Sequence, residues 1–236
     1  MDKKLWVIGD SFTGIGYRGV KSWTEIVSEN FNGKKFYISS KGSRDFQTIL
    51  DIFLRNLKNI SPNDFVILVI PTLIRTRVPL KIPNIDIELS NESRVDLKDC
   101  KDYFVGTSSY SKNSPNSILE PPLNYSEEKD MEKGSELWSI VNSSNASKQN
   151  YLKIIESLKS YLPFEIFIWS WTDEFESDLI FNKSKIKKEL GIWHTLHNLY
   201  NETNGKEGYE GDAHFSKQMN EKFAEYIIKQ FSQHFK

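Results

Sequence analysis

Strand-like and helix-like segments alternate over residues 5–70, and this order most strongly limits the folds open to the chain. Strand candidates lie at residues 5–8, 35–39 and 65–70. The last of these is apolar at every position, which is typical of a strand buried on both faces of a sheet. Strands that alternate with helices through short connections form parallel sheets with right-handed crossovers. The chain is therefore predicted to have an α/β fold with a central parallel sheet.

The segments between these strand candidates have helical periodicity. Ser22 and Glu25 have the spacing of a capping box, which marks the start of the first helix, and Gly33 ends it. The second helix has the strongest apolar periodicity in the chain, with side chains three and four positions apart that share one face. The residues of that face are Phe46, Ile49, Leu50, Phe53, Leu54 and Leu57.

The last third of the chain resumes this pattern. A helix with a regular apolar face ends at Pro163, and residues 164–171 form a fourth strand candidate. One or two further helices are predicted within residues 174–200, and a final helix is predicted after Ser216. No fifth strand is apparent.

Residues 78–147 lack a sustained period and are rich in Pro, Asn, Ser and charged residues. A structureless connection of this length is unusual inside a compact domain. We expect an insertion with short elements of its own, packed over one end of the sheet as a lid or a partner-binding surface. The whole chain, residues 1–236, is then a single domain with this long insertion after the third strand.

Composition limits the partners of such a fold. The 31 basic residues nearly balance the 32 acidic residues, so no nucleic acid or membrane surface is expected as a partner. The single cysteine, Cys100, excludes an intramolecular disulfide, and no His/Cys cluster has the spacing of a metal site. The apolar run before Gly9 is too short for a signal peptide, and no run approaches membrane-spanning length. A cytoplasmic location is expected, and a particle-associated protein would fit the same composition.

The first strand candidate stops at Gly9-Asp10-Ser11, which places Ser11 just beyond its carboxyl end. Open α/β sheets bind their ligands at that edge. A serine there can act as a nucleophile when a base lies within reach. The alternative is an ordinary turn, because Gly, Asp and Ser are all common turn residues.

His214 lies in a loop directly before the last helix, two residues after Asp212. An imidazole can accept a hydroxyl proton at neutral pH, and a carboxylate on its other nitrogen fixes the tautomer. Residues two apart in an extended segment point the same way, so the two side chains can meet. The alternative is that Asp212 and Ser216 only cap the helix. A surface or packing role is expected for the other three histidines, which fall in helical patterns: His194, His197 and His234.

A serine turn after the first strand and an Asp-x-His loop before the last helix resemble the SGNH (GDSL-like) hydrolase family. The residues that carry the resemblance are Gly9-Asp10-Ser11-Phe12, Gly42 after the second strand, and Asp212-Ala213-His214-Phe215-Ser216. The resemblance covers the chain ends and the sheet pattern, but not residues 78–147. It implies a flavodoxin-like three-layer α/β/α fold in which a Ser-His-Asp triad cleaves esters without a metal or other cofactor.

By this resemblance Ser11 is the nucleophile, His214 is the general base and Asp212 is the acid that orients it. The backbone N–H groups of Ser11 and Gly42 would be two donors of the oxyanion hole. The implied substrate is a short acyl ester of a small molecule or a glycan, such as an O-acetyl group of a carbohydrate.

The sequence departs from the family in two places. The family's Gly-x-Asn-Asp block supplies a further oxyanion donor after the third strand, but residues 70–75 read Ile-Pro-Thr-Leu-Ile-Arg. Thr72 is then the nearest donor, through its hydroxyl or its N–H, and losing one donor typically costs about 10²–10³ in turnover. The family's acid and base have the spacing Asp-x-x-His, whereas Asp212 and His214 have the spacing Asp-x-His. Glu210 is a weaker candidate than Asp212 for the acid.

Two residues at the rim of the expected site are candidates for substrate binding. Arg75 stands just past the third strand, where a guanidinium can hold a carboxylate or phosphate. Ion pairs with the acidic insertion are the alternative for this arginine. Trp171, near Asp173 at the end of the fourth strand, offers a ring suited to a sugar face, and core packing beside Trp169 is its alternative.

The sequence thus favours a serine ester hydrolase. An O-acyltransferase on the same scaffold remains open, because the triad is indifferent to whether water or a hydroxyl accepts the acyl group. The alternative function is that of a catalytically weakened protein used for binding or as part of an assembly. The missing asparagine and the long polar insertion favour this alternative.

Overall fold

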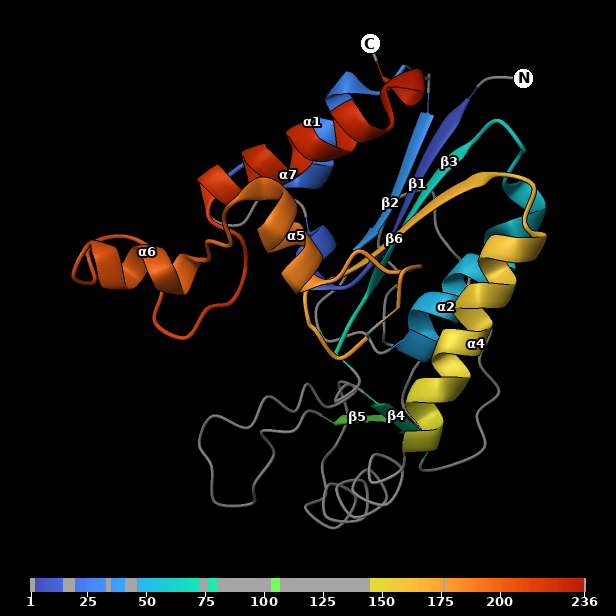
Figure 1. Ribbon diagram of the computed structural model, residues 1–236, viewed down its shortest axis with the longest axis horizontal. Helices are drawn as coiled ribbons and strands as arrows, with labels where there is room; N and C mark the ends of the chain where they lie inside the picture. Colours follow the sequence, from blue (N-terminus) through green and yellow to red (C-terminus); the bar gives the residue numbers. More distant parts are fainter. Residues whose placement is uncertain are drawn as a thin grey trace.

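The computed structural model describes residues 3–14, 20–32, 35–40, 46–72, 76–79, 103–106, 145–175 and 177–235. At its centre four parallel strands lie in the order β2-β1-β3-β6 (Figure 1). The prediction of an α/β fold with a central parallel sheet is therefore confirmed. The strands are β1 (Lys4–Gly9), β2 (Lys35–Ser40), β3 (Phe65–Ile70) and β6 (Glu165–Ser170).

Helices cover both faces of this sheet (Figure 1). On one face α1 (Trp23–Asn30) and α7 (Lys217–Gln230) lie side by side, with α5 (Lys183–Leu190) next to α7. On the other face lie α2 (Phe46–Asn56) and α4 (Asn145–Tyr161). The sheet thus forms the middle layer between two layers of helices.

Alternate side chains of the central strands enter two separate hydrophobic cores. Leu5 and Val7 of β1 face α1 and α7, whereas Trp6 and Ile8 face α2 and α4. The same alternation runs through β3, all of whose residues are buried. Because β1 and β3 occupy the middle of the sheet and are covered on both sides, all of β3 and residues 5–8 of β1 are apolar.

The outer edge of β6 is partly covered by a segment that the sequence did not mark as a strand. Phe181 forms a one-residue parallel bridge with Trp169. Its N–H donates to the Ile168 carbonyl at 2.9 Å, and its carbonyl accepts the Ser170 N–H at 3.2 Å. A single bridged residue produces no alternating pattern, which explains why no fifth strand was predicted.

Two short strands lie beyond the carboxyl ends of the central strands (Figure 1). β4 (Thr76–Pro79) and β5 (Tyr103–Gly106) pair in antiparallel fashion and form a sheet of their own. They fall mostly within the predicted insertion at residues 78–147, the greater part of which lies outside the described residues. α4 begins at Asn145, so regular structure resumes slightly before the predicted boundary.

Candidate active site

β1 ends at a tight turn that carries the predicted nucleophile. Ser11 opens a short 3₁₀ helix, Ser11–Thr13, just beyond the carboxyl end of β1, and it is half-buried. Asp10, which is fully buried, caps this helix: its Oδ1 accepts the Phe12 N–H at 3.0 Å, and its carbonyl accepts the Thr13 N–H at 3.0 Å. The turn therefore fixes Ser11 at the edge where α/β sheets bind their ligands.

Gly9 is required because neighbouring atoms approach its backbone closely. A Cβ at this position would lie 2.6 Å from Val69 Cβ and 2.5 Å from Thr13 Cγ2. Both distances are far below the 3.5–4.0 Å or so of a normal carbon–carbon contact. Since Val69 belongs to the neighbouring strand β3, the glycine lets the Ser11 turn lie directly against the sheet.

The first helix supports the same turn from the side. The Trp23 indole N–H donates to the Phe12 carbonyl at 2.6 Å, and the Thr24 hydroxyl donates to the Thr13 carbonyl at 3.1 Å. Both donor side chains are fully buried. The predicted capping box is present at the start of α1, and it fixes the helix end that makes these contacts.

Asp212 and His214 meet in the loop before α7. Asp212 Oδ1 lies 2.7 Å from His214 Nδ1 and also accepts the backbone N–H of His214 at 2.9 Å. A carboxylate on Nδ1 holds the imidazole hydrogen there and leaves Nε2 as the basic nitrogen. The His214 side chain is 32% exposed and that of Asp212 is 14% exposed, so the pair is partly buried and still accessible to solvent. Asp212, and not Glu210, thus partners this nitrogen.

Ring contacts join the two ends of the chain beside Ser11. Phe12 stacks on Trp171 at a ring-centroid distance of 4.6 Å and on His214 at 4.9 Å. The Trp171 indole N–H also donates to Asp10 Oδ2 at 3.0 Å. His214 therefore lies beside the residue that follows Ser11, although within the described chain no hydrogen bond joins the Ser11 hydroxyl to His214.

Asn220, buried in the first turn of α7, links the two halves of the site. Its Oδ1 accepts the Trp23 N–H at 2.9 Å, and its Nδ2 donates to the carbonyls of Phe215 and Ser216, both at 3.1 Å. Trp23 supports the Ser11 turn, and both carbonyls belong to the segment that follows His214. The Asn220 amide therefore connects the helix that supports the Ser11 turn to the loop that carries His214.

Thr72 lies two residues past the end of β3 and is buried. Its hydroxyl donates to Glu174 Oε1 at 2.7 Å. Glu174 comes from the segment after β6 and was not singled out from the sequence. Because the hydroxyl donates its hydrogen to this carboxylate, the backbone N–H of Thr72 is the better candidate for the predicted oxyanion donor.

Two of the predicted site residues, Gly42 and Arg75, lie outside the described residues. Trp171 lies one residue past β6 and is half-buried, with its ring on Phe12 and against the core that contains Trp169. Asp173 is exposed and accepts the Ser184 N–H at 2.7 Å, which places its carboxylate at the start of α5.

Within the described residues, no group of three or more His, Cys, Asp or Glu side chains is arranged to hold a metal ion. Among the helices described, none is both long and apolar enough to cross a membrane.

Comparisons with protein-family profiles, curated proteins and solved structures found no match to this chain. Its function is therefore inferred from the geometry of the site. Two contributors to that geometry could not be predicted from the sequence, the contact of the Phe12 ring with His214 and the Glu174 carboxylate. An apolar residue inside a polar turn was a signal for Phe12, whereas Glu174 gave none because its partner is 102 residues away.

Proposed function

We propose that the protein is a serine ester hydrolase that uses Ser11, His214 and Asp212. The observation that carries the proposal is the 2.7 Å contact between Asp212 Oδ1 and His214 Nδ1, on a ring that stacks against Phe12 next to Ser11. A carboxylate, an imidazole and a serine hydroxyl in this order can activate the serine for acyl transfer. The position of Ser11 at the carboxyl edge of a parallel sheet supports the same function.

In this mechanism His214 Nε2 accepts the proton of the Ser11 hydroxyl as Oγ attacks the acyl carbonyl. Asp212 stabilises the imidazolium, which then gives its proton to the leaving alcohol as the ester C–O bond breaks. Water then gives a proton to the same nitrogen as it attacks the acyl carbon. The bond from that carbon to Ser11 Oγ breaks, Oγ takes the proton back from His214 Nε2, and the carboxylic acid leaves. The Ser11–His214 hydrogen bond would form with substrate, because catalytic hydrogen bonds in free enzymes are often long and shorten on binding.

The oxyanion of the tetrahedral intermediate would be stabilised by the backbone N–H groups of Ser11, Gly42 and Thr72. The Thr72 hydroxyl already donates to Glu174, which supports a role for the N–H of this residue and not for its side chain. Loss of one side-chain donor typically lowers turnover about 10²–10³-fold. A slow enzyme is therefore expected.

We further propose that the fold is the flavodoxin-like fold of the SGNH hydrolases. The observed order β2-β1-β3-β6 corresponds to the first four strands of the flavodoxin-like order 2-1-3-4-5. The parallel bridge of Phe181 beside β6 lies in the position of a fifth strand, which supports the same assignment.

The proposed substrate is a short acyl ester of a small molecule or glycan, such as an O-acetyl group on a carbohydrate. Trp171 supports this class because an aromatic ring at the rim of the site can pack against a sugar. Arg75 is proposed to bind an anionic part of the substrate, since a guanidinium pairs well with carboxylates and phosphates.

A serine-directed fluorophosphonate probe tests the proposed nucleophile and base. We expect the native protein to be labelled, Ser11→Ala to remain unlabelled and His214→Ala to react far more slowly. Ser157→Ala is the matched control, because this exposed serine of α4 only donates locally to the Lys153 carbonyl, so labelling should be unchanged. Absence of labelling in the native protein, or equal labelling of Ser11→Ala, would contradict the proposal.

Glu174 favours a second candidate function, a binding or assembly protein with weakened catalysis. Its carboxylate holds the Thr72 hydroxyl at the corner where the SGNH family has an asparagine donor. A negative charge there would oppose the charge that develops on the oxyanion. The Glu174→Gln variant separates the two functions. Faster labelling of the variant indicates an enzyme whose rate Glu174 limits, whereas no labelling of either protein indicates a binding protein.

Hydrolysis and acyl transfer differ only in the group that accepts the acyl chain. Release of the acyl group from a labelled ester should be measured with and without an added sugar acceptor. An unchanged rate with free acid as product supports the hydrolase. A faster rate with acylated sugar as product assigns the protein as an O-acyltransferase.

A further inference from the structure

The loop that carries Asp212 and His214 is docked on the start of α6 (Leu196–Glu202). The Leu196 N–H donates to the His214 carbonyl at 2.8 Å, and the His197 N–H donates to the Asp212 carbonyl at 2.9 Å. These are the first two N–H groups of the helix, which have no partner inside it. The start of α6 therefore binds both members of the proposed acid–base pair through the main chain.

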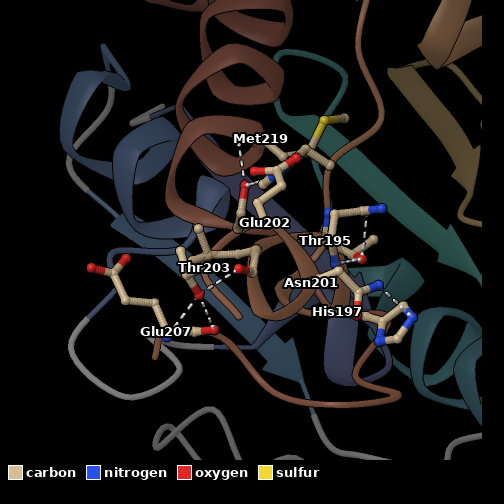
Figure 2. Close-up of polar contacts among 11 residues, drawn as sticks. Thr195, His197, Asn201, Glu202, Thr203, Glu207 and Met219 are labelled. Atoms are coloured by element: carbon tan, nitrogen blue, oxygen red, sulfur yellow. Dashed lines mark hydrogen bonds and ion pairs between the residues drawn. The ribbon is translucent and has the colours of Figure 1, made fainter. Parts of the chain in front are cut away.

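His197 adds a side-chain contact to the same loop. Its Nδ1 accepts the Gly211 N–H at 2.9 Å. Figure 2 shows the Asn201 amide turned toward the other side of the ring, 3.2 Å from Nε2. Gly211 has a φ of +74°, a left-handed conformation that favours glycine. The imidazole thus holds the residue directly before Asp212, at the point where the chain turns into the loop.

The connection between α6 and this loop is bonded back to the helix along its length. The Thr203 hydroxyl donates to the Leu199 carbonyl at 2.8 Å and accepts the Glu207 N–H at 2.9 Å (Figure 2). The Tyr209 N–H donates to the Leu196 carbonyl at 3.1 Å. The helix and the connection therefore form one unit, and the position of the loop depends on contacts made by α6.

We propose that His197 is a positioning residue for the triad, acting through Gly211 on Asp212; this inference rests on the proposed esterase function. Removal of the Nδ1 acceptor deprives the Gly211 N–H of this partner and lets the Asp212 carboxylate move away from His214 Nδ1. A displacement of about 1 Å in a catalytic group can lower the rate about 10²-fold. Because His197 contacts the loop and not the reacting atoms, its loss acts on kcat and leaves KM unchanged.

Two variants separate positioning from stability. His197→Asn keeps an acceptor near the place of Nδ1, whereas His197→Ala removes it. With p-nitrophenyl acetate as substrate, kcat should fall about 10–100-fold in His197→Ala at unchanged KM, and return to within about threefold of native in His197→Asn. Asn201→Ala is the matched control, because it removes the contact at Nε2 and retains the one to Gly211, so kcat should be unchanged. Thermal melts of all variants establish that they are folded.

Proton NMR gives a readout that does not depend on catalysis. The hydrogen on His214 Nδ1, bonded to Asp212, should give a low-field resonance that is lost in His197→Ala and restored in His197→Asn. An unchanged resonance and kcat in His197→Ala, or equal losses in both variants, would overturn the positioning role. If the native protein lacks esterase activity but the resonance responds as described, the proposed function fails, whereas the effect of His197 on the Asp212–His214 pair is upheld. Absence of the resonance in the native protein contradicts the pairing on which both depend.

Discussion

The residues of the Gly9-Asp10-Ser11-Phe12 turn have separate physical roles. Gly9 leaves room for the side chain of Val69 on the neighbouring strand. Asp10 is buried, caps the 3₁₀ helix with one oxygen and accepts an indole N–H with the other. Phe12 provides the ring on which His214 stacks. Together these neighbours hold Ser11 half-buried at the edge of the sheet, which suits a nucleophile.

Gly9→Ala tests the close packing behind the turn. The added Cβ should overlap Val69 and Thr13, lowering the free energy of unfolding by about 1–3 kcal/mol and slowing fluorophosphonate labelling. Gly191→Ala is a matched control, because nothing lies within 4 Å of a Cβ there and only its φ of +67° opposes the change. We expect the control to lose about 1 kcal/mol with labelling unchanged. Urea denaturation measures both, and native stability in Gly9→Ala would contradict the packing argument.

Asp212→Asn tests which acid orients His214, the proposed base. An amide can donate to Nδ1 and so favour the wrong tautomer, which in a comparable triad costs about 10⁴-fold in turnover. We expect a loss of labelling rate of about 10²–10⁴-fold, measured against Glu210→Gln as control. The control should react at the native rate, and a larger loss in Glu210→Gln would assign the acid to that residue instead.

Candidate site residues could be selected from the sequence where their setting is local, and not where their partners are distant. Ser11 could be selected because the strand before it ends abruptly, and the Asp212–His214 pair because two residues share one loop. The hydrogen bond between Thr72 and Glu174 joins residues 102 positions apart, so no local sequence pattern predicts it. For His197 a surface or packing role was predicted from its helical setting, and its contact with a glycine-rich loop became visible only in three dimensions.

At the level of elements, a C-terminal 3₁₀ turn, Ser232–His234, closes the amino end of the sheet. The His234 ring stacks on Phe65, the first residue of β3, at 4.6 Å. Its Nε2 lies 2.5 Å from Oε2 of Glu165, the first residue of β6. The Asn32 N–H also donates to the His234 carbonyl at 2.9 Å. This buried histidine thus ties the turn to two strands and to the segment after α1.

The stability of this closure should depend on pH. Burial lowers the pKa of His234 below its ordinary value of 6.5 and outweighs the hydrogen bond to Glu165, which raises it. The unfolded chain therefore takes up a proton at higher pH than the folded chain. The contribution to the free energy of unfolding is complete above pH 6.5 and is lost as the pH falls through and below that value.

His234→Gln removes this titration while keeping a donor toward Glu165. Urea denaturation between about pH 7.5 and pH 5 should show a smaller acid-induced loss of stability in the variant than in the native protein. The difference between the two proteins isolates His234 from the other titrating groups of the chain. Equal slopes would contradict a lowered pKa of His234 in the folded protein.

Long and regular elements could be predicted from the sequence, and short ones could not. α2 and β3 have unbroken apolar patterns because each is packed along its length against a core. β4 and β5 each contain only four residues, too few for a period to emerge from a polar segment. α6 has a single buried apolar residue, Leu196. Its apolar pattern is therefore weak, which explains why the sequence did not decide between one helix and two within residues 174–200.

At the scale of the whole molecule, the parallel sheet brings distant parts of the chain to one edge. The hydrogen bond between Trp23 and Asn220 joins residues 197 positions apart, and that between Asp10 and Trp171 spans 161 positions. The direction of the strands could be predicted from the alternation of elements. These two cross-links could not, because each depends on packing between helices or loops of remote segments.

Asn220→Ala tests the link between the two halves of the site. It removes three hydrogen bonds and leaves the buried Trp23 N–H without this acceptor, so we expect a loss of about 2–4 kcal/mol in unfolding free energy. Labelling at Ser11 should also slow. Asn30→Ala is the matched control, since this exposed amide donates only to the Ile26 carbonyl of its own helix, and about 0.5 kcal/mol or less is expected. Equal small losses in both variants would exclude a linking role for Asn220.

In the proposed mechanism, Ser11 and His214 act together on one reacting group. The most direct measurement is a crystal structure of the protein after reaction with a fluorophosphonate. We expect phosphorus bonded to Ser11 Oγ, with His214 Nε2 about 2.6–3.2 Å from an oxygen of the adduct and Asp212 still on Nδ1. An adduct on another residue, or an imidazole turned away from a phosphonylated Ser11, would contradict it.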